Sequence, residues 1–270
     1  MVFPIKESRV REIFDDFVQQ FSPETEVPVQ RKIDHSLRVA DEARTLGEQV
    51  LGQGDFTWFL GMCHDLGRFL QWREFKSFND KNSDHAQLSI AALYGIGVGG
   101  KDALINQMAP GIVFDPLAMQ IVTTAIVQHS RVAFSGIESE SVLMEYAQIL
   151  RDADIMDNFM FNFNLSDPAR LESLLHVNGF NIADLPESKV SPEVYSEFMQ
   201  GRAIDRSKIA INTPADQIVV WAGYFFNLSL AESKKKALPR IMEMLLDPTR
   251  FTNLATQMQF ATLRKSPGLS

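Results

Sequence analysis

The 270-residue sequence contains a single cysteine, Cys63, so a disulfide within the chain is excluded. Its first residues, MVFPIKESRVREIF, lack the continuous apolar segment of a secretory signal. No apolar run approaches the roughly 20 residues that span a bilayer, and even ALINQMAPGIVF is interrupted by Asn, Gln and Pro. We therefore expect a cytoplasmic protein that does not enter a membrane.

Positive charge is also scarce, because 26 Lys and Arg residues face 34 Asp and Glu residues, which gives a formal net charge of −8. Nucleic acid polymers and anionic membranes would be repelled by such a surface, so neither is an expected partner. A small phosphorylated substrate would need a local cation. With 45% hydrophobic residues the chain can bury a large core. The composition leaves open whether it forms a homo-oligomer.

Alternating polar and apolar segments, which are typical of β-strands, are almost absent. Apolar residues instead recur every three or four positions, which predicts an all-α protein. The expected helices cover about residues 29–50, Asp55 as N-cap to Gly67 as stop, Ser83-Asp84 to Gly95, Asp115-Pro116 to His129, and about 141–158. Residues 160–270 are expected to form further helices, with DQIVVWAGYFFNLSLAES in the core and the lysines at 234–236 in solvent.

Four expected helices carry a histidine on or at the end of the apolar face. In the helix over 29–50, His35 heads a stripe of Val39, Ala43, Leu46 and Val50. In the fourth helix, His129 ends a stripe of Leu117, Ile121 and Ala125. His64 and His85 hold similar positions in the second and third helices. The fifth histidine, His176 in LLHVNGF, is expected to be a hydrogen-bonded core residue.

Aspartates accompany these histidines. Asp65 follows His64 directly, and the segment LRDADIMDNF offers several more carboxylates. Helical spacing puts Asp154 on the apolar face of its helix, whereas Asp152 shares a face with Glu145, so Asp154 is the expected inward residue.

Four histidines and two aspartates at the inward edges of different helices predict a metal site. Buried ionisable groups are costly unless partners satisfy them, and one metal site satisfies them all. Imidazole and carboxylate ligands suit Fe, Mn, Ni or Zn, and suit Mg less well. The lack of cysteine ligands argues against a structural zinc site.

The order His35, His64-Asp65 and Asp154, with the segments HDLGRF, DHAQLSIAAL, AIVQHS and RDADIMD, resembles the HD-domain superfamily of metal-dependent phosphohydrolases. The resemblance covers about residues 30–160. It implies an HD-type helical bundle as the core of one domain over residues 1–270, with a helical extension over about 161–270.

The resemblance also implies the ligand set. His35, His64, Asp65 and Asp154 would bind a first ion. His85 and His129 would either complete a second site bridged by Asp65, or contact substrate and transfer protons. The chain departs from the family pattern at two positions, Ile155 and Ser130. Binuclear phosphodiesterases often have a histidine in place of Ser130, so we do not assign cyclic dinucleotide hydrolysis.

The implied reaction is hydrolysis of a nucleotide or other small phosphoester by water that one or two divalent ions activate. Asp65, His85 and His129 are the candidate catalytic residues. Arg68 is the first candidate for binding phosphate, because a guanidinium matches phosphate oxygens, and Lys81 and Arg131 are further candidates. Asp84 would orient His85 or cap its helix.

Two other functions stay open for the same ligand order. One is a di-iron oxygenase resembling myo-inositol oxygenase, and the other is a non-catalytic HD module that senses a nucleotide.

Overall fold

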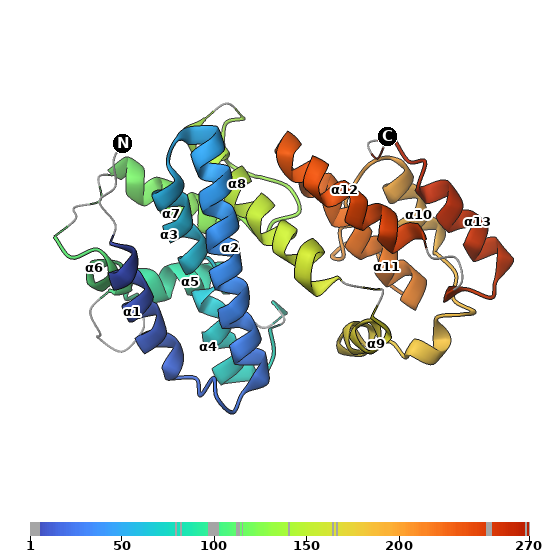
Figure 1. Cartoon of the computed structure of the whole chain (residues 1–270), viewed down its shortest axis with the longest axis horizontal. Helices are drawn as coiled ribbons and strands as arrows, with labels where there is room; N and C mark the ends of the chain where they lie inside the picture. Colours follow the sequence, from blue (N-terminus) through green and yellow to red (C-terminus); the bar gives the residue numbers. More distant parts are fainter. Residues whose placement is uncertain are drawn as a thin grey trace. The chain divides into compact units, whose positions relative to one another are not determined.

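The computed structural model describes residues 6–78, 80–81, 83–96, 103–111, 114, 116–139, 141–163, 165, 167–246, 250–267 and 269. These residues form helices, turns and irregular loops, and no β-strand occurs among them. The prediction of an all-α protein is therefore confirmed. The chain divides into two compact units, Met1–Asp157 and Asn158–Ser270, whose helices are labelled in Figure 1.

The first unit contains the helices α1 (Glu7–Gln19), α2 (Val27–Leu51), α3 (Gly54–Cys63), α4 (Leu66–Phe75), α5 (His85–Tyr94), α6 (Leu104–Met108), α7 (Pro116–Gln128) and α8 (Val142–Asp157). Helix α1 lies before the expected start of the core near residue 30, and it contacts α3 and α6. The first unit also contains all of the candidate metal ligands.

The long helix α2 packs most extensively on α3. Gly61 permits this close contact, because a Cβ atom there would lie 2.5 Å from Ala40 Cα. The buried residues of α2 include His35, Val39, Ala43 and Leu46. Val50, expected on the same face, is 46% exposed, since it lies in the last turn before the left-handed Gly52 ends the helix. The α2–α3 contact brings His35 of α2 close to His64, which follows α3.

The chain breaks its helix at the His64-Asp65 pair, between the end of α3 and the start of α4. The expectation that Gly67 stops the helix was wrong, because Gly67 is buried inside α4. A Cβ atom at this position would lie 2.1 Å from the backbone oxygen of His85, so glycine permits α4 to approach α5. Asp55 is likewise in the first turn of α3, and Gln53 occupies the N-cap.

Helix α5 begins and ends as the sequence predicts. The Asp84 side chain accepts hydrogen bonds from the backbone N–H groups of Ala86 and Gln87, and Gly95 ends the helix with a φ of 73°. The predicted cap of the next helix, Asp115, lies outside the described residues. In α7, Leu117 is 41% exposed rather than buried, because it occupies the first turn.

Helix α8 completes the first unit by contacting α2, α3 and α7. Helix α2 carries His35, and His64 and His129 directly follow the ends of α3 and α7. One element therefore meets three of the histidine-bearing segments, and its own aspartates lie beside them.

The second unit contains η1 (Asn158–Asn162), α9 (Pro168–Val177), η2 (Ile182–Asp184), α10 (Pro192–Met199), α11 (Pro214–Gly223), η3 (Tyr224–Asn227), α12 (Ala231–Leu246) and α13 (Leu254–Leu263). Every residue of α11 is buried, which confirms the predicted core helix up to Gly223. The lysines at 234–236 are exposed, as expected.

The expectation of a core position for His176 was wrong. The buried face of α9 consists of Leu171 and Leu175, and the next position along the helix turns toward solvent. Among the described residues, no helix combines the length and the apolar character that crossing a membrane requires.

Candidate metal centre

Four imidazoles surround the carboxylate of Asp65 in the first unit. The Nε2 atoms of His35 and His64 lie 3.5 and 3.4 Å from Asp65 Oδ2. The Nε2 atoms of His85 and His129 lie 3.5 and 3.7 Å from Asp65 Oδ1. All five residues are buried. The structure thus brings the four predicted histidines together, two on each oxygen of one carboxylate.

Asp154 joins this cluster from α8, with Oδ1 3.2 Å from His35 Nε2. Ligand atoms of His35, His64 and Asp154 lie within 4.8 Å of one another, as do those of His64, Asp65 and His129. Asp152 belongs to neither group, although it is fully buried and Asp154 is 21% exposed, so the expectation that Asp152 shares the outward face of Glu145 was wrong. The geometry therefore brings Asp154, the residue that helical spacing favoured, to the histidines.

Two of the histidines are oriented by helix ends. His64 and His129 directly follow the last residues of α3 and α7. Their Nδ1 atoms lie 2.7 Å from Gly61 O and 2.6 Å from Ile126 O, each three residues earlier in the chain. The last carbonyls of a helix lack intrahelical donors, so a histidine just beyond the end satisfies one. A carbonyl only accepts, so Nδ1 carries the proton in both rings.

The other two histidines are oriented by carboxylates. His35 Nδ1 lies 2.7 Å from Asp157 Oδ2, and Arg38 Nε donates to the second oxygen of this carboxylate at 2.5 Å. His85 Nδ1 lies 2.8 Å from Asp80 Oδ1. A carboxylate behind a histidine fixes the ring and makes it a better metal ligand. Each pair of histidines thus has one ring held by a carboxylate and one held by a helix carbonyl.

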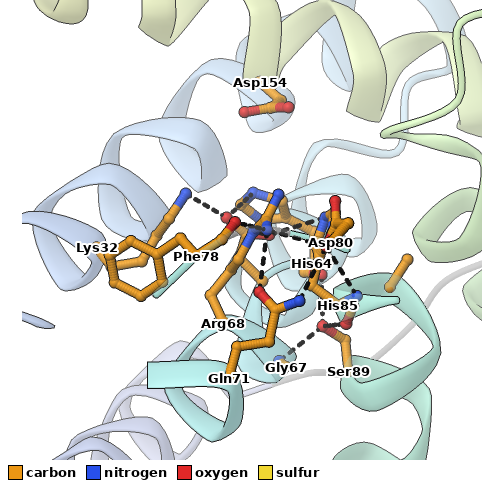
Figure 2. A network of polar contacts seen from close by, with 12 residues as sticks. Lys32, His64, Gly67, Arg68, Gln71, Phe78, Asp80, His85, Ser89 and Asp154 are labelled. Atoms are coloured by element: carbon orange, nitrogen blue, oxygen red, sulfur yellow. Dashed lines mark hydrogen bonds and ion pairs between the residues drawn. The ribbon is translucent and has the colours of Figure 1, made fainter. Parts of the chain in front are cut away.

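The expected orienting role of Asp84 belongs to Asp80 instead. Asp84 caps α5 and forms an ion pair with Arg131 at 2.5 Å. Asp80 also accepts hydrogen bonds from Arg68 and Gln71, which hold it against His85 (Figure 2).

The Nε2 atoms of the four rings face one another in pairs. The Nε2 atoms of His35 and His64 are 3.3 Å apart, and those of His85 and His129 are 3.2 Å apart. Because Nδ1 carries the proton in each ring, two neutral rings at these distances would point lone pairs at each other. Only a cation between them, either a proton or a metal ion, makes the arrangement favourable.

Asp65 Oδ1 provides a second test of whether a metal fits. This oxygen is buried and has no hydrogen-bond partner among the described residues. A buried carboxylate oxygen without a partner costs free energy. Its neighbours are the unprotonated Nε2 atoms of His85 and His129, which accept rather than donate, and Arg68 Nε, which at 3.7 Å is beyond hydrogen-bond distance. The donor set of imidazole nitrogens and carboxylate oxygens therefore fits one or two divalent transition-metal ions.

The pKa values of the cluster also suit a cation. Burial opposes protonation of His35, but hydrogen bonds to three carboxylates outweigh it and raise the pKa of His35 to about 10. Burial lowers the pKa of His85 to about 4 and lowers that of His64 as well. Burial favours the neutral form of Asp65, yet the Lys32 ammonium holds the pKa of this carboxyl well below its usual range. At neutral pH, the ionised carboxylate of Asp65 and the neutral rings of His64 and His85 are therefore available as ligands, whereas His35 holds a proton that a metal ion would displace.

Ser89 ties these elements together. Its Oγ accepts a hydrogen bond from Gly67 N at 2.8 Å, and lies 2.7 Å from His64 O and 2.9 Å from His85 O. The hydroxyl thus joins the His64-Asp65 break to the first turn of α5, as Figure 2 shows. This contact fixes the separation of the histidines on the two sides of Asp65.

The three cations predicted to bind phosphate have different environments. Arg68 Nε lies 3.7 Å from Asp65 Oδ1, at the edge of the cluster. Arg131 pairs with Asp84 and is half-exposed. Lys81 is exposed. Of these contacts, the one with a candidate ligand belongs to Arg68.

A fourth cation at the cluster was not predicted from the sequence: Lys32 Nζ lies 2.6 Å from Asp65 Oδ2. Asp157 and Asp80 were not predicted as site residues either. Lys32 and Asp157 each lie three residues from a candidate ligand on the same helix, so i,i+3 spacing was the signal for both. Asp80 lies outside the helices, where no periodicity identifies a partner.

Comparison of the chain with protein-family models, with curated proteins and with solved structures finds no match. The geometry of this site is therefore the structural basis from which a function can be inferred.

Proposed function

We propose that the chain is a metal-dependent phosphohydrolase that acts on a nucleotide or another small phosphoester. The observation that carries the proposal is the position of Asp65 between two histidine pairs, with one pair on each oxygen. This arrangement agrees with the resemblance of the motif order to the HD-domain superfamily.

The proposed centre has two halves that share Asp65. His35, His64 and Asp154 would hold one ion with Oδ2, and His85 and His129 would hold a second with Oδ1. Divalent ions held there would neutralise charge on a phosphoryl group. They would also lower the pKa of water, so that hydroxide is available as the nucleophile near neutral pH. Fe, Mn, Ni and Zn suit these ligands better than Mg.

The chain's own residues would prepare the reaction. Asp80 and Asp157 hold the protons on His85 Nδ1 and His35 Nδ1, so both rings present Nε2 as an acceptor. This tautomer leaves the Nε2 lone pairs of His85 and His129 free to bind a metal ion, and it excludes donation of a proton from Nε2 of either neutral ring. Burial of the cluster excludes bulk water, which strengthens its interactions with charge.

The partly exposed side chains at the edge of the cluster favour an anionic substrate. The side chains of Lys32, Asp154 and Arg68 are 20%, 21% and 17% exposed, whereas the other ligand candidates are at most 5% exposed. A ligand that arrives from solvent would therefore meet two cations. This favours phosphoester hydrolysis over the oxygenase reaction, which does not require an anion.

The proposal is tested by elemental analysis of the purified chain, followed by assays with phosphomonoesters and phosphodiesters in Mn, Fe, Ni, Zn and Mg. We expect hydrolysis that a chelator abolishes and that Asp65→Asn loses, while Asp84→Asn, a matched carboxylate outside the centre, retains it. Iron-dependent uptake of dioxygen without hydrolysis would favour the oxygenase. Nucleotide binding with neither reaction would favour the sensor.

A further inference from the structure

Each oxygen of Asp65 has a cation beside it as well as a pair of histidines. Lys32 Nζ lies 2.6 Å from Oδ2, and Arg68 Nε lies 3.7 Å from Oδ1. The two cations thus flank the carboxylate that would bridge the proposed ions. Both side chains are partly exposed.

The two cations are held very differently. Arg68 Nη1 donates to Gln71 Oε1, Phe78 O and Asp80 Oδ1 at 3.0, 2.5 and 3.0 Å, which fixes the guanidinium. For Lys32 Nζ, the one hydrogen bond among the described residues is to Asp65. Its four-carbon stem has several rotatable bonds, so a small rotation moves the ammonium by several ångströms. Lys32 is therefore the mobile cation and Arg68 the fixed one.

Lys32 and a divalent ion would compete for the same atom. Oδ2 is the oxygen that His35 Nε2 and His64 Nε2 approach, so an ion held by these nitrogens would lie beside it. An ammonium at hydrogen-bond distance from that oxygen would repel the ion. Lys32 must therefore turn away when the ion binds. Since its side chain is partly exposed, the ammonium can then reach an anion that enters from solvent.

We infer that Lys32 binds a phosphate oxygen of the substrate, and that it does so by giving up Asp65 Oδ2 to the ion. This inference rests on the proposed function, because it requires the centre to hold a divalent ion. It assigns Lys32 two measurable effects of opposite sign. The side chain weakens binding of the ion alone, and it strengthens binding of phosphate once the ion is present. A lysine that merely neutralises Asp65 for folding would produce neither effect.

The test uses the full chain with Lys32→Met and Lys32→Gln as neutral variants, so that either one decides if the other fails to fold. Lys32→Arg keeps the charge, and Lys76→Met is the matched control, because Lys76 pairs with Glu26 at 2.7 Å and is exposed. Calorimetry would measure the Kd of Mn²⁺ alone, and then the Kd of inorganic phosphate at saturating Mn²⁺. Thermal unfolding followed by circular dichroism checks the fold.

We expect the neutral variants to bind Mn²⁺ roughly tenfold more tightly and phosphate roughly tenfold more weakly, the effect of one charge-assisted hydrogen bond. Lys32→Arg and Lys76→Met should stay close to the unmodified chain in both measurements. An unchanged Kd for either Mn²⁺ or phosphate in the neutral variants overturns the inference and leaves the proposed function standing. If the unmodified chain binds no divalent ion, the proposed function fails and the inference fails with it.

Discussion

His85 Nε2 and His129 Nε2 face each other at 3.2 Å on one side of Asp65. Their Nδ1 atoms meet a carboxylate and a helix carbonyl, so both rings present an acceptor to the space between them. A pair of acceptors at this distance requires a cation, and we interpret the pair as half of a binuclear centre.

Removing either histidine should therefore remove one ion. We expect His85→Ala and His129→Ala to lower the number of divalent ions per chain from two toward one, because the half formed by His35, His64 and Asp154 keeps its ligands. Elemental analysis after gel filtration measures this number. His176→Ala is the control, since this histidine is exposed in the second unit. Constant metal content with lost hydrolysis would instead assign His85 and His129 to proton transfer.

Asp154 and Asp152 should differ sharply in their effect on metal binding. Asp154→Asn removes a charged ligand beside His35 and should weaken binding of the first ion by at least roughly tenfold. Asp152→Asn should leave the metal affinity near that of the unmodified chain. Both substitutions conserve side-chain size, so the comparison isolates charge at the cluster. The reverse ranking of the two affinities would show that helical spacing chose the wrong carboxylate.

Asp80 and Asp84 form a second matched pair. Asp80→Asn weakens the acceptor that holds His85 Nδ1, and we expect a loss in metal affinity of about 10–100-fold. Asp84→Asn should have little effect, because asparagine caps a helix about as well as aspartate. Competition with a fluorescent chelator would measure both affinities. A larger loss for Asp84→Asn would return the orienting role to that residue.

The stability of the chelated protein should fall as the pH rises. The pKa of His35 is raised to about 10 in the folded protein, against about 6.5 in an unfolded chain. The bound proton therefore contributes stability that is fully present below about pH 6.5 and is lost as the pH approaches 10. Urea unfolding with chelator present, from pH 6 to pH 10, measures this loss, and His35→Gln should flatten it. An equal slope in the two proteins would contradict the assignment.

Gly67→Ala should damage both fold and site. The added Cβ atom would lie 2.1 Å from the backbone oxygen of His85, so α4 and α5 must separate. We expect a loss of about 1–3 kcal/mol in the free energy of unfolding, as for other overpacked cores, together with weaker metal binding. An alanine variant as stable as the unmodified chain would mean that the contact adapts without cost.

The sequence predicted the parts of the site that follow helical periodicity. His35, Asp154 and His129 were located because each continues an apolar stripe. Gly67 was misread because a glycine that stops a helix and a glycine that permits close packing look the same in one sequence. Asp84 was considered as an orienting residue because it adjoins His85, whereas the hydrogen bond from His85 Nδ1 is accepted by Asp80, five positions before His85. Lys32 was missed because a lysine on a helix ordinarily faces solvent.

The central claim is that Asp65 bridges two divalent ions, and the number of ions bound by Asp65→Asn tests it most directly. The unmodified chain and the variant would each be equilibrated with Mn²⁺, separated from free ion and analysed for metal per folded chain. The account predicts two ions for the unmodified chain and loss of both from the variant, because the neutral amide can no longer ligate on both sides. Two ions retained by Asp65→Asn, or none bound by the unmodified chain, would contradict it.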